Sequence, residues 1–437
     1  MRRVAVVGSG IAGLAAARSL SRHVVVTLFE AAGWFGGHAH TVDLTLDGVT
    51  HGVDTGFLVF NERTYPGLIA LFAELGVATT RADMSFSVQV RADDLEWSGS
   101  GLDTVFAQRA NLARPRFWRM LAEILRFNRL TSALAADATP QGLASLDQPL
   151  GEFLAAHAFS DAFRDWYFLP MIGSIWSCPT DQMLRFPMAT LIRFCHNHGL
   201  LQVTGRPAWH TVRGGARNYV TRMLESIADA RLATPVHRVR RLAAGGVEIA
   251  TDAGSERFDA VVMACHSDQS LALLGDASAA ERKLLGAIRY QANRAVLHCD
   301  RSVLPRQQRA WAAWNYDRAA GPDRQCASVC LHYLVNRLQP LPFKTPVIVS
   351  LNPVADPAAG SVHGEFDYAH PVFDRAAIAA QERVPGLQGH RDTWFCGAWT
   401  RYGFHEDGLA SGLAVAAQIA ARWRRGEDAA MPVAEAA

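Results

Sequence analysis

Two short apolar runs open the chain and flank a stretch of small residues. Residues 4–7 read Val-Ala-Val-Val, and the second run covers residues 24–29. A continuous apolar run of this length is typical of a parallel strand that is covered on both faces. The small residues between the runs predict a helix, so the pattern indicates a strand, a crossover helix and a second parallel strand.

The rest of the chain alternates between helical and strand-like patterns. Helical spacing recurs over residues 110–135 and 150–168, and an alternation typical of a hairpin follows residue 236. A third apolar run covers residues 258–264. This mixture predicts an α/β fold whose parallel strands are separated by long insertions.

Glycines fill the turn after the first strand, which reads Gly8-Ser9-Gly10-Ile11-Ala12-Gly13. Gly8 permits a tight turn, Gly10 lets the backbone approach a pyrophosphate, and Gly13 lets the helix pack on the strand. The second strand ends at Glu30, where a carboxylate can accept hydrogen bonds from a ribose diol. Strand, turn, helix, strand and terminal acid in this order predict a dinucleotide site, with the phosphates at the helix N-terminus.

Composition excludes several other classes of protein. The chain has 437 residues and is 49% hydrophobic, which predicts two domains. Lysine and arginine number 43 against 41 acids, so the net charge of +2 gives no broad footprint for nucleic acid. The seven cysteines are scattered and form no Cys-x-x-Cys pair, which indicates neither a disulfide framework nor a zinc site. We expect no bound metal.

Location follows from what the sequence lacks. No apolar stretch approaches the roughly 18 to 20 residues that a transmembrane helix needs. The two arginines after Met1 lead directly into a strand-like run, which does not fit an export signal. We therefore expect a cytoplasmic protein, with contact at the inner face of the membrane left open.

Four further blocks carry a resemblance to a known family. They are residues 36–41 (Gly-Gly-His-Ala-His-Thr), residues 51–57, residues 211–236 and residues 394–412 with its run Gly-Phe-His-Glu-Asp-Gly. Together with the glycine turn, they resemble the FAD-dependent flavin amine oxidase superfamily, which includes the phytoene-type desaturases. The resemblance implies FAD as cofactor and a Rossmann-like FAD-binding domain of the glutathione-reductase/amine-oxidase type, interleaved with an α+β substrate domain.

The resemblance also implies which residues bind the cofactor. In that family the Gly-Gly loop meets the phosphates, and an Asp-x-Gly strand passes the flavin. The backbone at the residue that precedes the hairpin meets the adenine, and the last helix points at the pyrimidine edge. Carried onto this chain, the set is Gly8, Ser9, Gly10, Ile11, Ala12, Gly13, Glu30, Ala31, Gly36, Gly37, His38, Thr41, Gly56, Phe57, Leu58, Val236, Ala264, Gly397, Glu406, Asp407, Gly408 and Ser411. Where the family usually has arginines near the Gly-Gly loop, this chain has Trp34 and His38, so backbone amides or other side chains must meet the phosphates there.

The domain boundaries follow the same motifs. We expect the FAD-binding domain at residues 1–77, 206–289 and 386–425, and the substrate or cap domain at residues 78–205 and 290–385, with a tail at 426–437. Only one glycine fingerprint is present, so electrons should come from an organic substrate rather than from a pyridine nucleotide.

Two residues are candidates for catalysis. His405 stands three residues before Gly408, where the family places an aromatic residue over the flavin, so it could exchange a proton or could simply order the loop. Lys344 falls loosely where amine oxidases carry a lysine near the flavin N5, although a surface lysine is the commoner explanation. His196 with His198, and Cys326 with Cys330, lack a complete set of metal ligands.

The substrate is inferred from the cap. Residues 163–176 are aromatic and aliphatic with few charges, which suits a long apolar molecule and equally suits a cap core. The sequence most resembles bacterial NAD/FAD-binding proteins associated with cyclopropane-type fatty acid synthases. This favours hydride transfer from a lipid-like substrate, such as an unsaturated or methylated fatty acyl chain, to flavin N5. A lipid or polyene isomerase, an amine oxidase, and a non-catalytic partner of a lipid-modifying methyltransferase remain alternatives.

A basic amphipathic helix is the one feature that bears on membranes. Residues 114–129 contain five arginines, Arg114 among them, and a single acid, Glu123. Such a helix can lie on an anionic bilayer, but charge runs are more often a solvated surface, which favours an ordinary cap helix.

Overall fold

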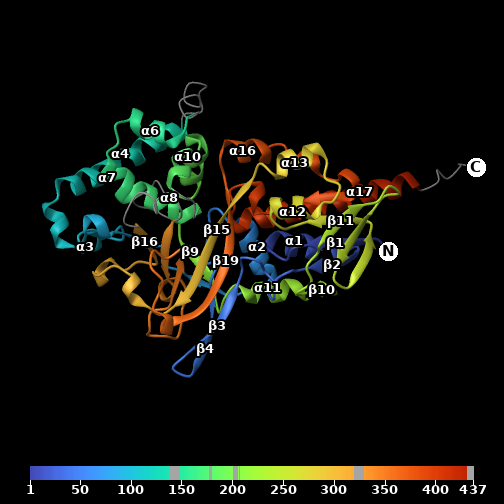
Figure 1. The fold of residues 1–437 in the computed structure, drawn as a ribbon, viewed down its shortest axis with the longest axis horizontal. Helices are drawn as coiled ribbons and strands as arrows, with labels where there is room; N and C mark the ends of the chain where they lie inside the picture. The colour runs from blue at the N-terminus through green and yellow to red at the C-terminus, as the bar shows by residue number, and fades with distance from the viewer. Residues whose placement is uncertain (137–147, 177–179, 200–204, 206, 319–328, 431–437) are drawn as a thin grey trace, which may run out of the picture.

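The fold is taken from a computed structural model that describes residues 1–136, 148–176, 180–199, 205, 207–318 and 329–430. Figure 1 shows two bodies: a parallel sheet with its helices on the right, and a group of helices on the left. Strands of a second, larger sheet lie between them.

The parallel sheet has five strands in the order β10, β2, β1, β14, β20. Their bounds are β1 (Arg3–Val7), β2 (Val25–Phe29), β10 (Asp229–Arg231), β14 (Ala260–Met263) and β20 (Thr393–Phe395). Strands from three distant parts of the sequence therefore form one sheet, which confirms the predicted α/β class and the Rossmann-like parallel core.

Both faces of this sheet are covered, which explains why its strands are continuously apolar. On one face lie α1 (Ile11–Leu20), α2 (Pro66–Leu75), α11 (Arg217–Leu224) and the long α17 (His405–Ala430). On the other lie the antiparallel strands β11 (Arg238–Arg241), β12 (Val247–Thr251) and β13 (Gly254–Phe258), with α12 (Ser267–Leu273), α13 (Ala279–Leu285) and α16 (Arg375–Gln381). Helices α1 and α17 touch closely, because a Cβ at Gly412 would lie 2.1 Å from the carbonyl oxygen of Ala12.

A seven-stranded sheet joins the two insertions. Its order is β19, β15, β18, β17, β16, β7, β8. The bounds are β7 (Phe86–Val90), β8 (Leu95–Ser98), β15 (Arg289–His298), β16 (Trp314–Arg318), β17 (Cys330–Leu334), β18 (Ile348–Leu351) and β19 (Val362–Val372). Strand β7 pairs in parallel with β16, although more than 200 residues separate them, so both insertions contribute to one sheet.

Helices complete the cap. They are α3 (Leu102–Val105), α4 (Pro115–Ala136), α6 (Leu150–Ala156), α7 (Asp161–Phe163), the π-helical turn η3 (Arg164–Phe168), α8 (Leu169–Trp176), α9 (Thr180–Met183) and α10 (Met188–Asn197). Their core is rich in phenylalanine, including Phe117, Phe127, Phe153 and Phe163, all at most 2% exposed.

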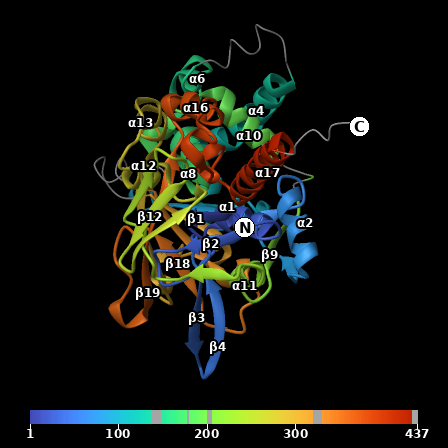
Figure 2. The ribbon, with the colours of Figure 1, turned by 90° about the vertical axis from the view of Figure 1, so that its right-hand side faces the viewer.

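Short elements connect the two bodies. They are the hairpin of β3 (Thr41–Leu46) and β4 (Val49–Asp54), the small sheet of β5 (Phe60–Asn61), β9 (Trp209–Val212) and β6 (Thr79–Arg81), and α15 (Val335–Leu338). Figure 2 shows the hairpin projecting away from the cap helices. The expected boundary at residue 77 falls inside the small sheet, and α16, expected in the cap, packs on the parallel sheet. Helix α17 runs past residue 425 to Ala430, and residues 431–437 of the expected tail lie outside the described residues.

Candidate cofactor and substrate site

The glycine turn after β1 has free space beside one of its glycines and close backbone contact at another. Gly8 has a φ of +103° and donates from its N–H to the carbonyl oxygen of Phe29 at 2.8 Å. A Cβ at Gly13 would lie 1.9 Å from the carbonyl oxygen of Gly8, whereas a Cβ at Gly10 would meet no protein atom within 4 Å. The backbone therefore leaves room for a ligand at Gly10, while the contact of α1 with β1 requires glycine at position 13.

Glu30 is fixed beside this turn. Its carboxylate accepts hydrogen bonds from the Ser9 N–H at 2.9 Å, the Ser9 hydroxyl at 2.5 Å and the Ala32 N–H at 2.9 Å. The Ser9 hydroxyl oxygen in turn accepts from the N–H of Gly36 at 3.0 Å. Two glycine loops, a helix N-terminus and an oriented carboxylate thus meet at one place, which is the chemistry that a ribose diphosphate needs.

A cavity of about 1080 Å³ extends from the two glycine loops into the cap. Fifteen of the cofactor and catalytic candidates line it, namely Gly8, Ser9, Gly10, Ile11, Ala12, Glu30, Gly36, Gly37, His38, Gly56, Phe57, Leu58, Ala264, Gly397 and His405. They come from the loops after the parallel strands β1, β2, β14 and β20, from the loop after β4, and from the start of α17. Open α/β sheets bind their ligands at the carboxyl ends of their strands.

Several other candidates support the wall from behind. Apart from Glu406, Asp407 and Lys344, the candidates outside the lining are Gly13, Ala31, Thr41, Val236, Gly408 and Ser411. The Thr41 hydroxyl donates to the buried carboxylate of Asp54 at 2.5 Å, and the Gly397 N–H donates to the Ser411 hydroxyl at 2.9 Å. Val236 packs in the core on the opposite face of the sheet, so only its backbone could serve a ligand.

The two acids after His405 have hydrogen-bonding roles within the fold. Glu406 accepts from the backbone N–H groups of Gly67 at 2.7 Å and Leu68 at 2.9 Å, so it caps the first turn of α2. Asp407 accepts from the Phe404 N–H at 3.1 Å at the start of α17, and burial raises its pKa to about 6. Both carboxylates are used by helix N-termini because free N–H groups are concentrated there.

His405 is held rigidly in the wall. Its ring stacks on Phe57 with the centroids 3.7 Å apart, and its Nε2 lies 2.8 Å from the Tyr219 hydroxyl. Burial lowers the pKa of His405 to about 3, and His38 lowers it further, so the imidazole is neutral near pH 7. Burial also raises the pKa of Tyr219 well above its usual value, so the phenol stays protonated and can donate to Nε2.

Lys344 is outside the site. It is exposed, in the loop between α15 and β18, and does not line the cavity. This position fits a surface lysine, the commoner explanation.

Three further histidines line the cavity, although none of them was predicted to bind the cofactor or substrate: His198, His266 and His370. Burial lowers their pKa values to about 4, 4 and 3. His370 lies 5.2 Å from His38 between ring centroids, and His266 stacks on Tyr290 at 4.3 Å. His266 could have been predicted from the sequence, because it follows the carboxyl end of β14, and open α/β sheets bind ligands at the carboxyl ends of their strands.

The apolar segment of the cap divides between wall and core. Tyr167, Met171 and Ile175 line the cavity. Phe163, Trp166, Phe168, Ile172 and Trp176 are buried in the cap core. Unanticipated aromatic side chains from other segments complete the wall, namely Phe86, Trp97, Phe194, Trp209, Trp314, Tyr333 and Phe404.

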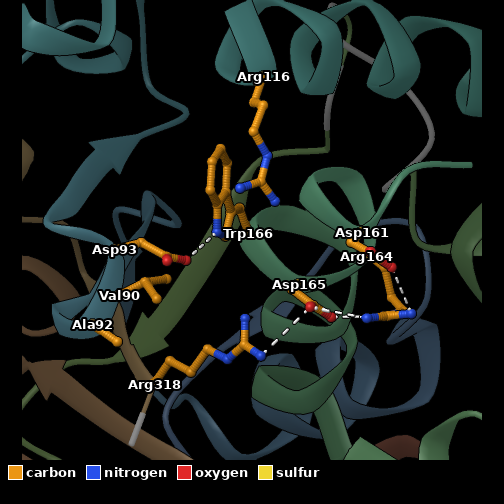
Figure 3. Close-up of a pocket in the computed structure, with 9 residues that line it drawn as sticks. All are labelled: Val90, Ala92, Asp93, Arg116, Asp161, Arg164, Asp165, Trp166 and Arg318. Carbon is orange, nitrogen blue, oxygen red and sulfur yellow. Dashed lines mark hydrogen bonds and ion pairs between the residues drawn. The ribbon is translucent and has the colours of Figure 1, made fainter. Parts of the chain in front are cut away.

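A smaller pocket of about 290 Å³ lies in the cap and contains none of the glycine-loop residues. Figure 3 shows Arg164 and Arg318 directed at Asp165, and Arg116 beside the ring of Trp166. Arg164 donates to Asp165 at 2.7 Å, Arg318 reaches the same carboxylate at 3.5 Å, and the Trp166 indole donates to Asp93 at 2.7 Å. Because these charges are matched internally, the pocket is an ion-paired joint between helices and strand rather than a second ligand site.

The candidates for metal ligation are separated. His198 faces the cavity, where its Nδ1 lies 3.0 Å from the Phe194 carbonyl oxygen, and Cys326 lies outside the described residues. Cys330 does gather with Asp317 and His332 in the interior of the cap sheet. Arg91 already donates to that aspartate at 3.0 and 3.1 Å, so its charge is matched without an ion.

Comparison with known proteins identifies the family. The family model for flavin containing amine oxidoreductases matches residues 11–314, which is more than half of the chain. The protein belongs to this family. Accordingly it is an FAD-dependent oxidoreductase, and the predicted family, enzyme class and cofactor are confirmed.

Relatives agree with this assignment. The chain is 30% identical over 285 residues to the carotenoid phi-ring synthase of Streptomyces griseus, which covers 60% of this chain and 52% of that protein. It therefore spans about half the length of this curated relative. Among solved structures, the fatty acid isomerase of P. acnes matches with a TM-score of 0.65 at 17% identity, covering 95% of this chain and 98% of that one. Cyclohexylamine oxidase from Brevibacterium oxydans matches with a TM-score of 0.65 at 18% identity, covering 97% and 100%.

FAD fits the residues present. The open space at Gly10 and the N-terminus of α1 would receive the pyrophosphate, and the Glu30 carboxylate would receive the ribose. When bound, FAD supplies an acceptor for a hydride. The neutral histidines and the aromatic wall would then surround the remaining part of the cavity.

Proposed function

We propose that this enzyme takes a hydride from a long, apolar, lipid-like substrate, such as an unsaturated or methylated fatty acyl chain, to the flavin N5. The observation that carries the proposal is the chemistry of the cavity wall. Beyond the glycine loops, the described lining is dominated by aromatic and aliphatic side chains such as Trp97, Leu121, Ile124, Met171 and Ile175. A wall of this kind favours burial of apolar area over recognition of charge.

Charged groups are scarce in the same wall. Among the described lining residues there is no lysine or arginine, and the only carboxylates are Glu30 and Asp83. Glu30 is held by the glycine turn, and Asp83 pairs with Arg337 at 3.1 Å. A cationic amine would thus find no free carboxylate along this wall, which argues against an amine substrate.

The relatives add support for substrate class. One is named for a carotenoid, a long polyene, and one solved structure of the same fold is a fatty acid isomerase. Both names describe elongated hydrocarbon substrates, in keeping with the shape and lining of this cavity.

The chain's own contribution to the reaction is positioning and exclusion of water. Tyr219 and Phe57 fix the ring of His405, and the neutral state of that ring leaves a single proton on Nδ1 when Nε2 accepts from the phenol. An imidazole in this state can donate one hydrogen bond but does not act as a strong acid. The apolar wall keeps water from the reacting carbon.

Anaerobic mixing of the purified flavoprotein with fatty acyl lipids tests the proposal. Flavin absorbance at about 450 nm should bleach with the lipid alone, because reduced flavin loses this band. Parallel samples contain amines or NADPH. Bleaching by an amine or NADPH and not by lipid would overturn the proposal.

An isomerase is the second candidate, because the fatty acid isomerase shares the fold over nearly the whole chain. Product formation without oxygen uptake and without net bleaching would identify it. Neither product nor bleaching with any substrate would instead point to the flavoprotein as a partner of a lipid-modifying methyltransferase.

A further inference from the structure

Large apolar side chains are exposed together at one end of the cap. Leu102 is 80% exposed, Leu125 is 52% exposed, and Leu112 and Trp118 are each 49% exposed. These four make up nearly half of the exposed large hydrophobic residues in the described part of the chain, and they fall within 24 consecutive positions. A cluster of this kind marks an interaction surface, whereas single exposed apolar residues do not.

The four side chains belong to one continuous surface, which we call the cap apron. The Trp118 indole donates to the Leu112 carbonyl oxygen at 3.0 Å, so these two are adjacent. Trp118 and Leu125 are seven residues apart on α4, and Leu121 lies between them on the same face of the helix. Figure 1 shows α3 and α4 together at the end of the molecule farthest from the parallel sheet.

This surface is continuous with the large cavity. Leu102 and Leu125 both line the cavity and are more than half exposed, so they form part of its mouth. Val105, Leu121 and Ile124 follow on the inside. An apolar molecule that moves from the cap apron into the cavity therefore follows a continuous apolar wall toward the glycine loops.

Charges around the cap apron are positive. Arg116, Arg119, Arg126 and Arg129 are exposed on α4. The only acid of that helix, Glu123, has a side chain 9% exposed and accepts from the Arg119 Nε at 3.2 Å and from the Ser160 N–H and hydroxyl. The exposed Asp103 on α3 lies 3.3 Å from Arg109 and 3.4 Å from Arg309. In contact with an anionic bilayer, the tryptophan and leucines would meet the acyl layer, and the arginines around them would meet the anionic headgroups.

We propose that the cap apron docks on an anionic phospholipid bilayer, so that the cavity mouth opens toward the acyl chains. This deepens the proposed function, because it explains how an insoluble substrate reaches a buried flavin. No described helix is long and apolar enough to cross a membrane, so docking would be reversible and confined to the interface.

Vesicle sedimentation of the FAD-loaded protein tests docking separately from catalysis. Vesicles of phosphatidylcholine with phosphatidylglycerol should bind the protein, phosphatidylcholine alone should bind it at least tenfold less, and salt should release it. The double variant L112S/W118S, which leaves the cavity lining intact, should bind at least tenfold more weakly. The matched control is V49S, which changes a residue 46% exposed at the tip of the β3–β4 hairpin, away from the cap in both views.

Arginine variants separate charge from apolar contact. R119Q/R129Q should reduce binding to vesicles that contain phosphatidylglycerol and leave weak binding to phosphatidylcholine unchanged. Equal binding by wild type and L112S/W118S, or loss of binding in V49S alone, would overturn the docking proposal. If vesicles bind through the cap apron while no lipid bleaches the flavin, the proposed function fails and docking stands.

Discussion

The two halves of the cavity are built by different means. Around the glycine loops the wall is mainly backbone, fixed by Gly8, Gly10 and Gly13 and by the carboxylate of Glu30. In the cap the wall is mainly side chain, brought together from the seven-stranded sheet and from α3, α4 and α8. The cofactor half is therefore sensitive to a single added methyl group, whereas the substrate half should respond to the polarity of individual side chains.

The largest expected effect is at Gly13. The substitution Gly13→Ala places a Cβ 1.9 Å from the carbonyl oxygen of Gly8, and neither atom can move without separating α1 from β1. We expect protein that retains essentially no flavin and is destabilised by about 3 kcal/mol or more. Flavin content and thermal unfolding of the purified variant measure both effects, with Gly33→Ala, whose added Cβ meets no atom within 4 Å, as the control.

Gly10→Ala sharpens the contrast. Its Cβ meets no protein atom, so the stability of the flavin-free protein should change by at most about 1 kcal/mol. FAD affinity should nevertheless fall at least tenfold, because the methyl group occupies the open space of the cradle. Unchanged affinity would show that the pyrophosphate does not approach here.

In the substrate half, the substitution Ile175→Asn places an amide without a hydrogen-bond partner in an apolar wall. The KM for an acyl substrate should therefore rise about tenfold, while the flavin content stays unchanged. The control is Leu413→Asn, at a residue of α17 that is 44% exposed. Steady-state kinetics with both variants distinguish the wall from the surface. Loss of flavin in the first variant would mean that the two halves are not separate.

Acid should destabilise the protein. Burial lowers the pKa of five lining histidines, His38, His198, His266, His370 and His405, to about 3 or 4, whereas the unfolded chain titrates near 6.5. Below about pH 6.5 the unfolded chain therefore binds more protons, and stability should fall as the pH drops from about 6.5 to 4. The raised pKa values of Asp54, about 7, and Asp407, about 6, act in the opposite direction but involve fewer groups.

Calorimetry of the protein between pH 7 and pH 4 checks this slope. His266→Phe should flatten it, because one buried neutral imidazole is removed. His390→Phe, at an exposed position, should leave the slope unchanged. A Tm that is constant over this range would contradict the neutral state of the lining histidines.

The smallest effect concerns Glu406. Glu406→Ala removes the acceptor for two N–H groups at the start of α2, which should lower stability by about 1 to 2 kcal/mol. Flavin content should stay the same. Loss of flavin without loss of stability would restore this residue to the cofactor site.

The local pattern of the chain was sufficient for the cofactor half. A buried strand, a glycine turn, a helix and a terminal acid follow one another within 30 residues, and the geometry of each depends on its neighbours in sequence. The conformation of glycine and the N-terminus of a helix are local properties, so they can be read before the fold is known.

Tertiary structure alone decided the rest. Trp97, Trp314 and His370 reach one cavity only because β7 pairs with β16 across the two insertions and β15 pairs with β19. Glu406 stands beside the cofactor motif in sequence, yet it serves α2, because that helix N-terminus is nearer in space. The apolar stretch at residues 163–176 likewise divides between wall and core according to which face each residue turns to the sheet. Sequence determines what a segment can do locally, and packing determines which groups it meets.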